Sequence, residues 1–556
     1  RRFRKRKLQI DQDEVVGTIL RAKDRAETDR AVWKENHARW LAKYLGQIEP
    51  AAEGANIHIP VLMSHVQRLT AGVVGALFAG GRVLKVRSRS RARVGQENTL
   101  EEFLNYQLIH ELDLEKVVEK LALDFFVHGK FIVKVPWMVK REGVRRVHKY
   151  AAGMDERSVL AQLYPEPDVQ IERDGEYGYT VTKPGGDEPV VEKVDVYPQK
   201  DKLEVLVTGE TITYENPKIV RRRLDDLYVP NPDTLTNILD SAWIIDRSWL
   251  TVDEIKRLHK NKTYDLLSPE DMTEIEEWAE AQVDGGNLPE GGGMGGTQEV
   301  SAGQQGVAIQ EDQTGTRQGL AVLECYWWWD VDGDGLKERV IFWVVEKFKK
   351  LARAKYLSEV YRDQEWPYAE AGFIPTEGFY HMGVPEFAEG LQDAIIVLHN
   401  QGIEWGQITN TPVGFYRPAS GLKPEPIRYK MGELIPLDTP RDDVYFPTWP
   451  SSSGTWRFNE ESLLNQYLDR GLSQGPVQFG QAPEGRASAI RTARATLALI
   501  GQSDLASDLT LKRFLQGITR IFYLVWRRDK EFMRPGREFR VVGVQDPGET
   551  PFGVIE

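Results

Sequence analysis

The chain of 556 residues is longer than one hydrophobic core usually serves, so we expect two or more domains. Apolar residues make up 41% and charged residues 28%, as in ordinary folded proteins, while a formal net charge of −12 argues against a surface that grips nucleic acid everywhere. The single cysteine, Cys325, excludes an intramolecular disulfide and a cysteine-cluster metal site, and suits folding in a reducing cytoplasm.

The first part of the chain is predicted to be helical. It begins with RRFRKRKLQI, a basic arm that we interpret as solvated, with an arm that binds phosphate on DNA or contacts an acidic neighbour as the alternative. Apolar and charged patterns then predict one long helix over residues 11–45, followed by helices over 59–79 and 98–127. The longest uncharged apolar stretch, residues 69–81, is shorter than the roughly 20 residues that span a bilayer, so no membrane partner is expected.

Strand signals begin after this helical part. A Thr208-Gly209-Glu210 sequence resembles a hairpin connection between two short strands. Thr251, with Glu254 three residues later, has the pattern of a capping box at a helix start. Helices followed by antiparallel strands predict an α+β fold. The strands are expected at residues 130–137, 190–197, 203–207, 211–214, 320–329 and 339–345.

One segment of this region has a different composition. Residues 284–318 are rich in glycine and polar residues, and such a sequence cannot bury enough apolar surface to offset its ordering entropy. We interpret the segment as an exposed flexible loop between the two halves of the α+β region.

The sharpest local motif lies between the last two expected strands. Asp330, Asp332 and Asp334, followed by glycine at 335, match the opening of a calcium-binding loop, but position twelve, where a bidentate glutamate belongs, is Ile341. A β-hairpin turn that uses Asp and Gly for positive φ explains the motif without metal. We therefore expect no metal and no cofactor, and keep a calcium-binding structural or adhesion protein as an alternative.

Enzyme motifs are missing from the sequence. It contains no G-x-x-x-x-G-K-[ST] phosphate loop, no H-E-x-x-H and no G-x-S-x-G. The chain is therefore not expected to be an enzyme. A DNA-processing enzyme with an unrecognised carboxylate site stays open as the second alternative.

The most informative stretch runs from residue 385 to residue 524. Phe387, Leu391 and Ile395 begin an apolar stripe on a predicted helix, and a second helix is predicted from residue 459. Between them lies an insert full of proline and glycine, which break helices and mark turns between short strands. A helix, a small β-like insert and a returning helix predict a protruding hairpin. Because no catalytic motif accompanies the hairpin, we infer that its shape serves the function.

A glycine-broken loop follows the second helix. In the sequence QGPVQFGQAPEGRAS, Gln478, Gln481 and Arg486 offer polar tips that could touch phosphates without sequence preference, although an ordinary solvent loop explains them equally well. A strongly apolar helix is then expected over residues 509–526. The basic residues that follow it complement the helix dipole.

This order of parts resembles the portal proteins of tailed bacteriophages, and specifically the large portals of short-tailed viruses. The resemblance rests on EGLQDAIIVLHNQGIEWGQITN, on the insert that begins TPVGFY, on the return segment APEGRASAIRTARATLALIG and on the hairpin VLECYWWWDVDGDGLKERVIFWVVE. It covers most of the chain in element order and is strongest over residues 320–524. Its motifs are compositional and topological.

The resemblance implies a ring, usually of twelve subunits, at one vertex of the capsid. It implies a wing over residues 1–385, a clip over 411–457 between stem helices at 386–410 and 458–473, and a tunnel loop over 474–488. Long helices over 489–534 would lead toward a crown, and residues 535–556 would be strand-like, with no recognisable crown barrel.

The resemblance also implies partners and a location. The ring would conduct double-stranded DNA without sequence specificity during genome packaging and ejection, and would meet the large terminase, the tail adaptor, the major capsid protein and the scaffolding protein. Assembly would take place in the host cytoplasm, and the final location would be the virion. Lys423, Arg428 and Lys430 would contact DNA or terminase in the clip, and Gln478, Gln481 and Arg486 would face DNA in the tunnel loop.

Overall fold

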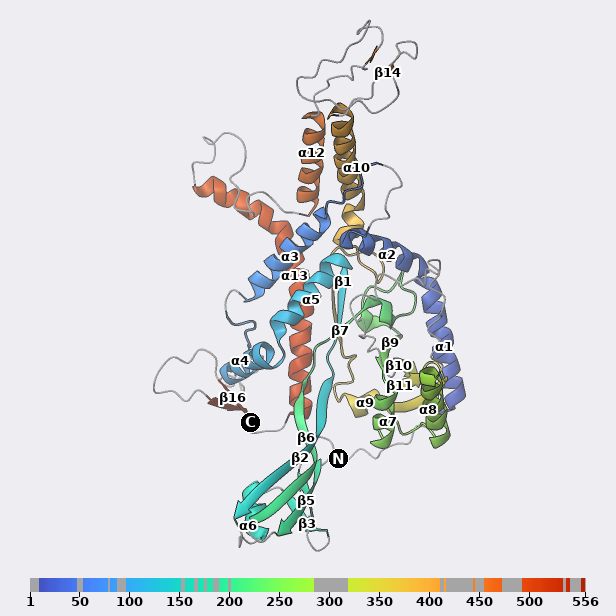
Figure 1. Ribbon diagram of the computed structural model, residues 1–556, viewed down its shortest axis with the longest axis vertical. Coiled ribbons are helices and arrows are strands. Elements are labelled where there is room, and N and C mark those ends of the chain that lie inside the picture. Colours follow the sequence, from blue (N-terminus) through green and yellow to red (C-terminus); the bar gives the residue numbers. More distant parts are fainter. Residues whose placement is uncertain are drawn as a thin grey trace.

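The molecule is elongated, with a two-helix hairpin at one end, a β-rich subdomain at the other and helix α13 along its middle (Figure 1). Helices and strands are both abundant, in agreement with the α+β expectation. A computed structural model describes residues 10–47, 54–78, 81–87, 97–151, 156–164, 169–174, 178–183, 190–198, 202–284, 319–410, 415–416, 444–445, 455–472, 493–533, 537–540 and 552–555.

The largest hydrophobic core lies between helices and a three-stranded antiparallel sheet of order β13-β1-β7. Phe125, Phe131, Phe373 and Phe514 meet edge to face or tilted near its centre, an arrangement that aromatic rings favour. The elements that form this core and sheet are α3 (Val61–Phe78), α4 (Glu97–Tyr106), the π-helical turn η2 (Gln107–Glu111), α5 (Leu114–Val127), β1 (Lys130–Lys134), β7 (Val220–Arg222), β13 (Tyr368–Gly372) and α13 (Ala493–Phe532).

Helix α3 is the most apolar helix of the described residues. By length and composition alone it could cross a membrane, since its 18 residues have a mean hydropathy of 1.3. The window includes Arg68, so the uncharged stretch that was expected to be too short for a bilayer, residues 69–81, overlaps only its second half. Leu62, Val66 and Val73 are buried against α5 and the rest of the core, which accounts for the apolar character of that side of α3.

The single helix expected over residues 11–45 is wrong: the chain forms α1 (Gln12–Asp29) and α2 (Ala31–Leu45), with a bend at Arg30. Arg30 is buried, its guanidinium donates to the carbonyl oxygens of Leu224, Asp225 and Leu227, and it stacks 4.1 Å from the ring centre of Tyr228. These distant partners determine the bend.

A five-stranded antiparallel sheet of order β12-β11-β10-β9-β8 forms the second layered unit. Helix α1 packs on one face, and α7 (Val252–Lys260) and α8 (Pro269–Asp284) pack on the other. The expected strands at 320–329 and 339–345 are confirmed, and so is the Thr251–Glu254 capping box. The strands are β8 (Leu227–Tyr228), β9 (Trp243–Leu250), β10 (Leu320–Trp329), β11 (Glu338–Val345) and β12 (Lys350–Tyr356).

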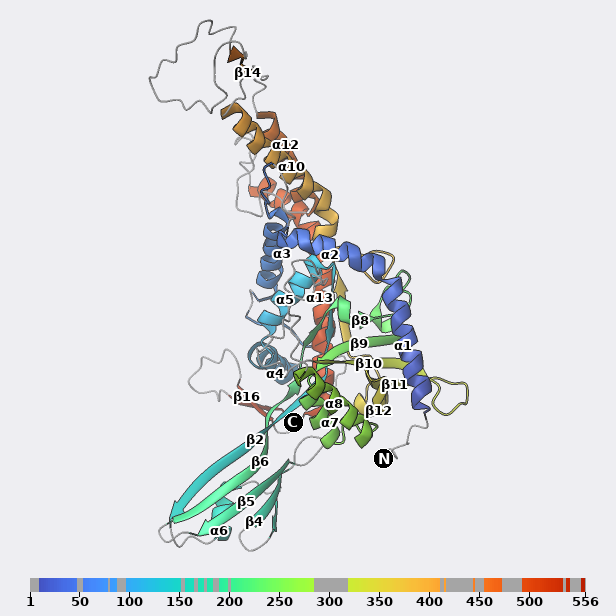
Figure 2. The same cartoon turned by 45° about the vertical axis from the view of Figure 1, so that its right-hand side comes forward.

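A second five-stranded sheet, of order β2-β6-β5-β4-β3, extends away from the body with α6 (Glu156–Leu163) packed on it (Figure 2). The hairpin connection expected at 208–210 is wrong, because those residues continue strand β6. β6 stays extended because it pairs with β2 along nearly its whole length. The strands are β2 (Trp137–Ala151), β3 (Gln170–Arg173), β4 (Gly178–Lys183), β5 (Val190–Pro198) and β6 (Lys202–Pro217).

Apart from the two helices of the projecting hairpin, the elements not yet named are short. The loop residues 285–318, expected to be flexible, lie outside the described residues. Residues 535–556, expected to be strand-like, contain two strands that pair with each other. These short elements are α9 (Leu357–Val360), β14 (Phe415–Tyr416), β15 (Val444–Tyr445), β16 (Arg537–Arg540) and β17 (Phe552–Ile555).

Candidate functional site: the α10–α12 hairpin

Two helices, α10 (Val384–Asn410) and α12 (Thr455–Gly471), lie side by side and project from the body (Figures 1 and 2). Val384 and Ala388 of α10 and Leu468 of α12 are buried at the base of the hairpin, in the same core as α5 and α13. The apolar positions near the start of α10 and near the end of α12 therefore anchor the hairpin in the body.

The base of α10 joins the body through a close approach of main chains. Gly129, between α5 and β1, has φ +77°, a conformation that glycine adopts at no steric cost. A Cβ at Gly129 would lie 2.0 Å from the carbonyl oxygen of His381, and one at Gly383 would lie 2.4 Å from the carbonyl oxygen of Val127. The two glycines let these segments touch directly in front of α10.

A polar cluster ties α2 to the first turns of α10. Lys43 Nζ lies 2.7 Å from Glu389 Oε1 and 2.5 Å from Asp393 Oδ2, and Trp40 Nε1 donates to Glu389 Oε2 at 2.8 Å. Burial acts to raise the pKa of Glu389, but the hydrogen bonds from Lys43 and Trp40 and the charges of Lys43 and Arg39 together outweigh burial, and that pKa lies below its ordinary value. The ionised carboxylate therefore holds α10 against α2.

An extended segment, residues 55–60, forms one stretch with the first turn of α3 and runs along the same side of α10. Three α10 side chains spaced by multiples of four residues bond its main chain: Gln392 Oε1 accepts from an amide at 3.1 Å, Asn400 Oδ1 at 2.9 Å and Glu404 Oε1 at 3.1 Å. Asn400 also donates to the carbonyl oxygen of Ile57 at 3.3 Å. Such spacing puts the three side chains on one face of a helix, which fixes the segment to α10.

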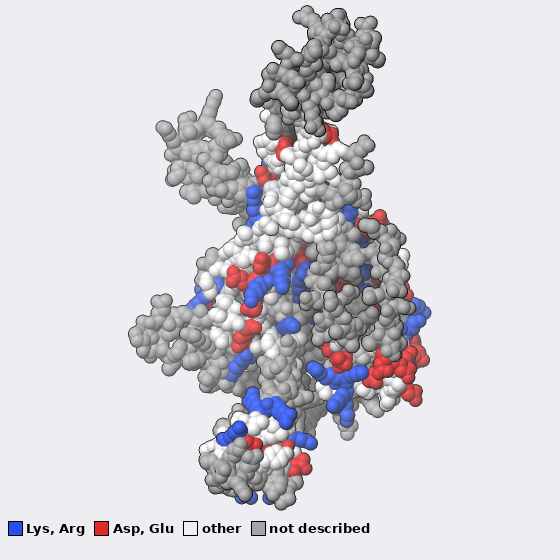
Figure 3. Space-filling model, viewed as in Figure 1, with Lys and Arg blue, Asp and Glu red and all other residues white. Residues whose placement is uncertain are grey.

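The hairpin carries exposed apolar side chains. Phe387 and Val397 on α10, and Leu463 and Tyr467 on α12, are 40–52% exposed. In the face shown by Figure 3, the described part of the hairpin is largely free of charged residues, unlike the body below it. A projecting surface of this kind is suited to burial against another protein surface.

All six site residues expected from the sequence lie outside the described residues. Gln478, Gln481 and Arg486 fall in the segment between α12 and α13. Lys423, Arg428 and Lys430 fall between β14 and β15, which pair Phe415 with Tyr445 and Tyr416 with Val444 in a two-residue antiparallel ladder. Their roles stay predictions.

The acidic turn between β10 and β11 has the geometry of a glycine-assisted turn. Gly333 and Gly335 have φ values of +74° and +86°. Asp330 accepts the amides of both glycines, at 2.7 and 2.9 Å, and Glu338 accepts the amide of Val331 at 3.2 Å. One carboxylate oxygen from each of Asp330, Asp332 and Glu338 lies within 4.8 Å of the others. The hydrogen bonds from main-chain amides to Asp330 and Glu338 explain both residues as parts of the turn.

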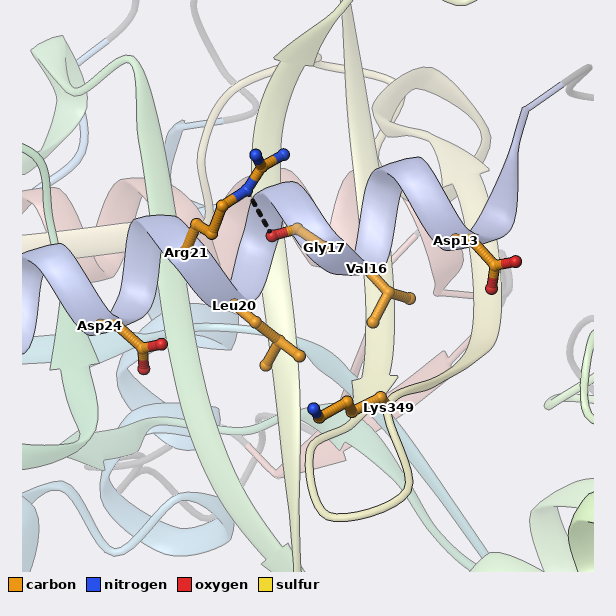
Figure 4. Close-up of a pocket in the computed structure, with 7 residues that line it drawn as sticks. All are labelled: Asp13, Val16, Gly17, Leu20, Arg21, Asp24 and Lys349. Atoms are coloured by element: carbon orange, nitrogen blue, oxygen red, sulfur yellow. Dashed lines mark hydrogen bonds between the residues drawn. The ribbon is translucent and has the colours of Figure 1, made fainter.

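A shallow cavity of about 430 Å³ lies beside α1. Figure 4 shows Val16 and Leu20 on the side of α1 that faces Lys349, and Arg21 turned away to donate to the carbonyl oxygen of Gly17 at 3.1 Å. The mixture of two acidic and two basic side chains does not converge on one point, so the cavity defines no ligand chemistry. Its lining residues are Asp13, Val16, Gly17, Leu20, Arg21, Asp24 and Lys349.

The structure is an α+β body that carries a projecting pair of helices with exposed apolar side chains. Comparison with known families gives a match to the Phage SU10 portal protein over residues 22–427, well over half of the chain. The chain therefore belongs to this family of bacteriophage portal proteins. The family is structural rather than enzymatic, and it implies an oligomeric component of the phage capsid. Comparison with curated proteins yields no match.

Sequence reasoning missed the residues that fix the hairpin to the body. Lys43, Gln392 and Asn400 read as ordinary polar positions on two helices, because each gains its role from a partner more than 300 residues away. The polar positions 392, 400 and 404, spaced by multiples of four in an apolar helix, are the one local signal that could have pointed to a polar partner.

Proposed function

We propose that the protein forms the ring-shaped channel at one capsid vertex of a short-tailed phage, through which the genome is packaged and later ejected. The ring, usually of twelve subunits in such proteins, docks the large terminase and then the tail adaptor, and contacts the capsid and scaffolding proteins. The observation that carries the proposal is the projecting α10–α12 hairpin with exposed apolar side chains, in a member of a portal family.

In this proposal α10 and α12 are the stem, and the chain between them, residues 411–457, is the clip that meets the motor and the adaptor. The body up to residue 385 is the wing, and α13 leads from the wing toward a crown. A head-to-tail ring buries the same two surfaces in every subunit, which would cover the exposed apolar residues of the stem. A net charge of −12 supports passage of DNA, because a broadly basic wall would hold a polyanion.

The ring contact can be tested on the stem surface. Replacing Leu463 and Tyr467 together by aspartate puts two charges on exposed positions, so each subunit should still fold while the ring falls apart into smaller species. Size-exclusion chromatography with light scattering measures the mass. Val147→Asp with Ile171→Asp, equally exposed apolar positions on the distant sheet, is the matched control and should leave the ring intact. An intact ring in the stem variant would contradict the proposed contact.

The DNA contact can be tested at the proposed tunnel loop. Arg486→Glu should impair genome packaging by placing a negative charge where DNA passes, while rings still assemble. The measurement is DNA packaged into capsids in a reaction supplied with terminase and ATP. Arg491→Glu, the same change beyond the loop, is the control. Unchanged packaging by the Arg486 variant would remove its role.

A further inference from the structure

The C-terminal part of α13 meets the π-helical turn η2 through two buried side chains. Gln107 Nε2 donates to Asp529 Oδ1 at 2.8 Å, and the two residues are 0% and 3% exposed. Gln107 Oε1 and Asp529 Oδ2 are buried too, and neither has a hydrogen-bond partner among the residues that the structure describes. Two unpaired acceptor oxygens in one contact need an explanation, because each costs about 1–3 kcal/mol when it is left unsatisfied.

A single proton would satisfy both oxygens. An ionised carboxylate only accepts hydrogen bonds, whereas a protonated one has an O–H donor, and an amide offers both a donor and an acceptor. A proton on Oδ2 would give Asp529 a donor to offer Gln107 Oε1, while its Oδ1 accepts from Gln107 Nε2 at 2.8 Å. We propose that Asp529 carries this proton in the folded protein at neutral pH, and that the resulting acid–amide pair is a proton-dependent latch between α13 and η2.

Among the described residues, no positively charged side chain forms a salt bridge with Asp529. Arg537 of β16 donates to both carboxylate oxygens of Glu111 at 3.0 Å and to Asn216 Oδ1 of β6 at 2.6 Å. Tyr214 of β6 lies close to Arg537 and Glu111. Burial raises the pKa of Asp529 from its ordinary 3.8 to about 7, although the Gln107 hydrogen bond and the Arg537 charge act to lower it.

The raised pKa of Asp529 determines how the stability of the contact between α13 and η2 depends on pH. Between pH 4 and pH 7 the folded protein holds one more proton at Asp529 than the unfolded chain, so the latch contributes its full stability below about pH 4 and loses it progressively as the pH rises from about 4 to 7. Within this window the equilibrium constant for opening the latch should therefore rise about tenfold for each pH unit, and above pH 7 it should level off.

The test compares the assembled protein with its Asp529→Asn variant, whose amide can make the same two hydrogen bonds without a proton. Hydrogen-exchange protection of residues 107–111, corrected for the intrinsic pH dependence of exchange, should fall about 30-fold in the parent protein between pH 5 and pH 6.5 and stay constant in the variant. The infrared carbonyl band of protonated carboxylic acids should be stronger in the parent at pH 6 than in the variant, because burial also raises the pKa values of Asp124 and Asp246 and their contribution is common to both proteins.

Asp363→Asn is the matched control, because Asp363 is as buried but lies 3.4 Å from the Arg528 guanidinium as its ionic partner. That change should lower the thermal midpoint at both pH values, whereas Asp529→Asn should not lower it at pH 6. Three outcomes would overturn the proposal: an Asp529→Asn variant that is destabilised or unfolded at pH 6, equal protection of the parent at both pH values, or an acid carbonyl band of equal intensity in the parent and the variant.

Discussion

Replacing Lys134 by methionine is expected to destabilise the protein by about 3–5 kcal/mol, because the change breaks a buried ion cluster on one side only. Lys134 Nζ lies 2.5 Å from Glu324 Oε2 and 3.7 Å from Asp246 Oδ2, at the contact between the three-stranded sheet and the sheet of β8–β12. Asp246 also accepts from Arg222 at 2.8 Å and from Tyr368 at 2.9 Å. Without Lys134, two carboxylates share one arginine in a buried site.

The charges around Glu324 show why the lysine matters. Burial acts to raise the pKa of Glu324, but Lys134, together with the Tyr326 hydrogen bond and the Arg222 charge, outweighs burial, and the pKa lies below its ordinary value. Guanidinium unfolding measures the loss. The control is Lys116→Met, which removes a 3.1 Å pair with Asp113 on the surface and should cost no more than about 1 kcal/mol. Equal effects of the two substitutions would contradict the role of the buried cluster.

Replacing Gly129 by alanine is expected to lower the free energy of unfolding by about 2–5 kcal/mol and to displace the start of α10 from the body. A left-handed conformation costs a non-glycine residue roughly 1–2 kcal/mol, and overpacking adds about 1–3 kcal/mol. Overpacking is unavoidable here, because the new Cβ would lie 2.0 Å from the main-chain oxygen of His381, which cannot move without shifting the segment before α10.

The matched control for this change is Gly17→Ala. Gly17 lies within α1 with nothing within 4 Å of an added Cβ, so alanine should be neutral or stabilising by up to about 1 kcal/mol. Thermal unfolding of the two variants against the parent measures both effects. A Gly129 variant as stable as the parent would show that the joint between α5 and α10 tolerates movement.

Patterns within a short stretch of sequence correctly predicted the elements that depend on neighbouring residues alone. The apolar and aromatic runs of β10 and β11 and the capping box at Thr251 appear in the structure as expected. The bend at Arg30 and the continuous strand β6 could not be predicted in this way, since Arg30 is bonded by residues near 225 and β6 is kept extended by β2. Distant partners overrode the local signal in both cases.

The dependence on distant partners also limited what the sequence could predict about the candidate site. The order of helix, insert and returning helix predicted a portal protein, and the family match confirms that prediction. It could not predict the buried lysines of β1, because Lys130 and Lys134 read as exposed positions until Glu370 and Glu324 are brought beside them. Nor could it reveal the fixation of α10 by residues 55–62, since main-chain partners leave no mark in the sequence.

The most direct test of the proposed function is an electron-microscopy image of the purified protein in negative stain. The account predicts ring-shaped particles with a central hole, of which the projecting α10–α12 hairpins form the narrow part. Particles that stay monomeric, or that assemble without a central hole, at concentrations where portal rings form would contradict the proposal that this protein builds a DNA channel.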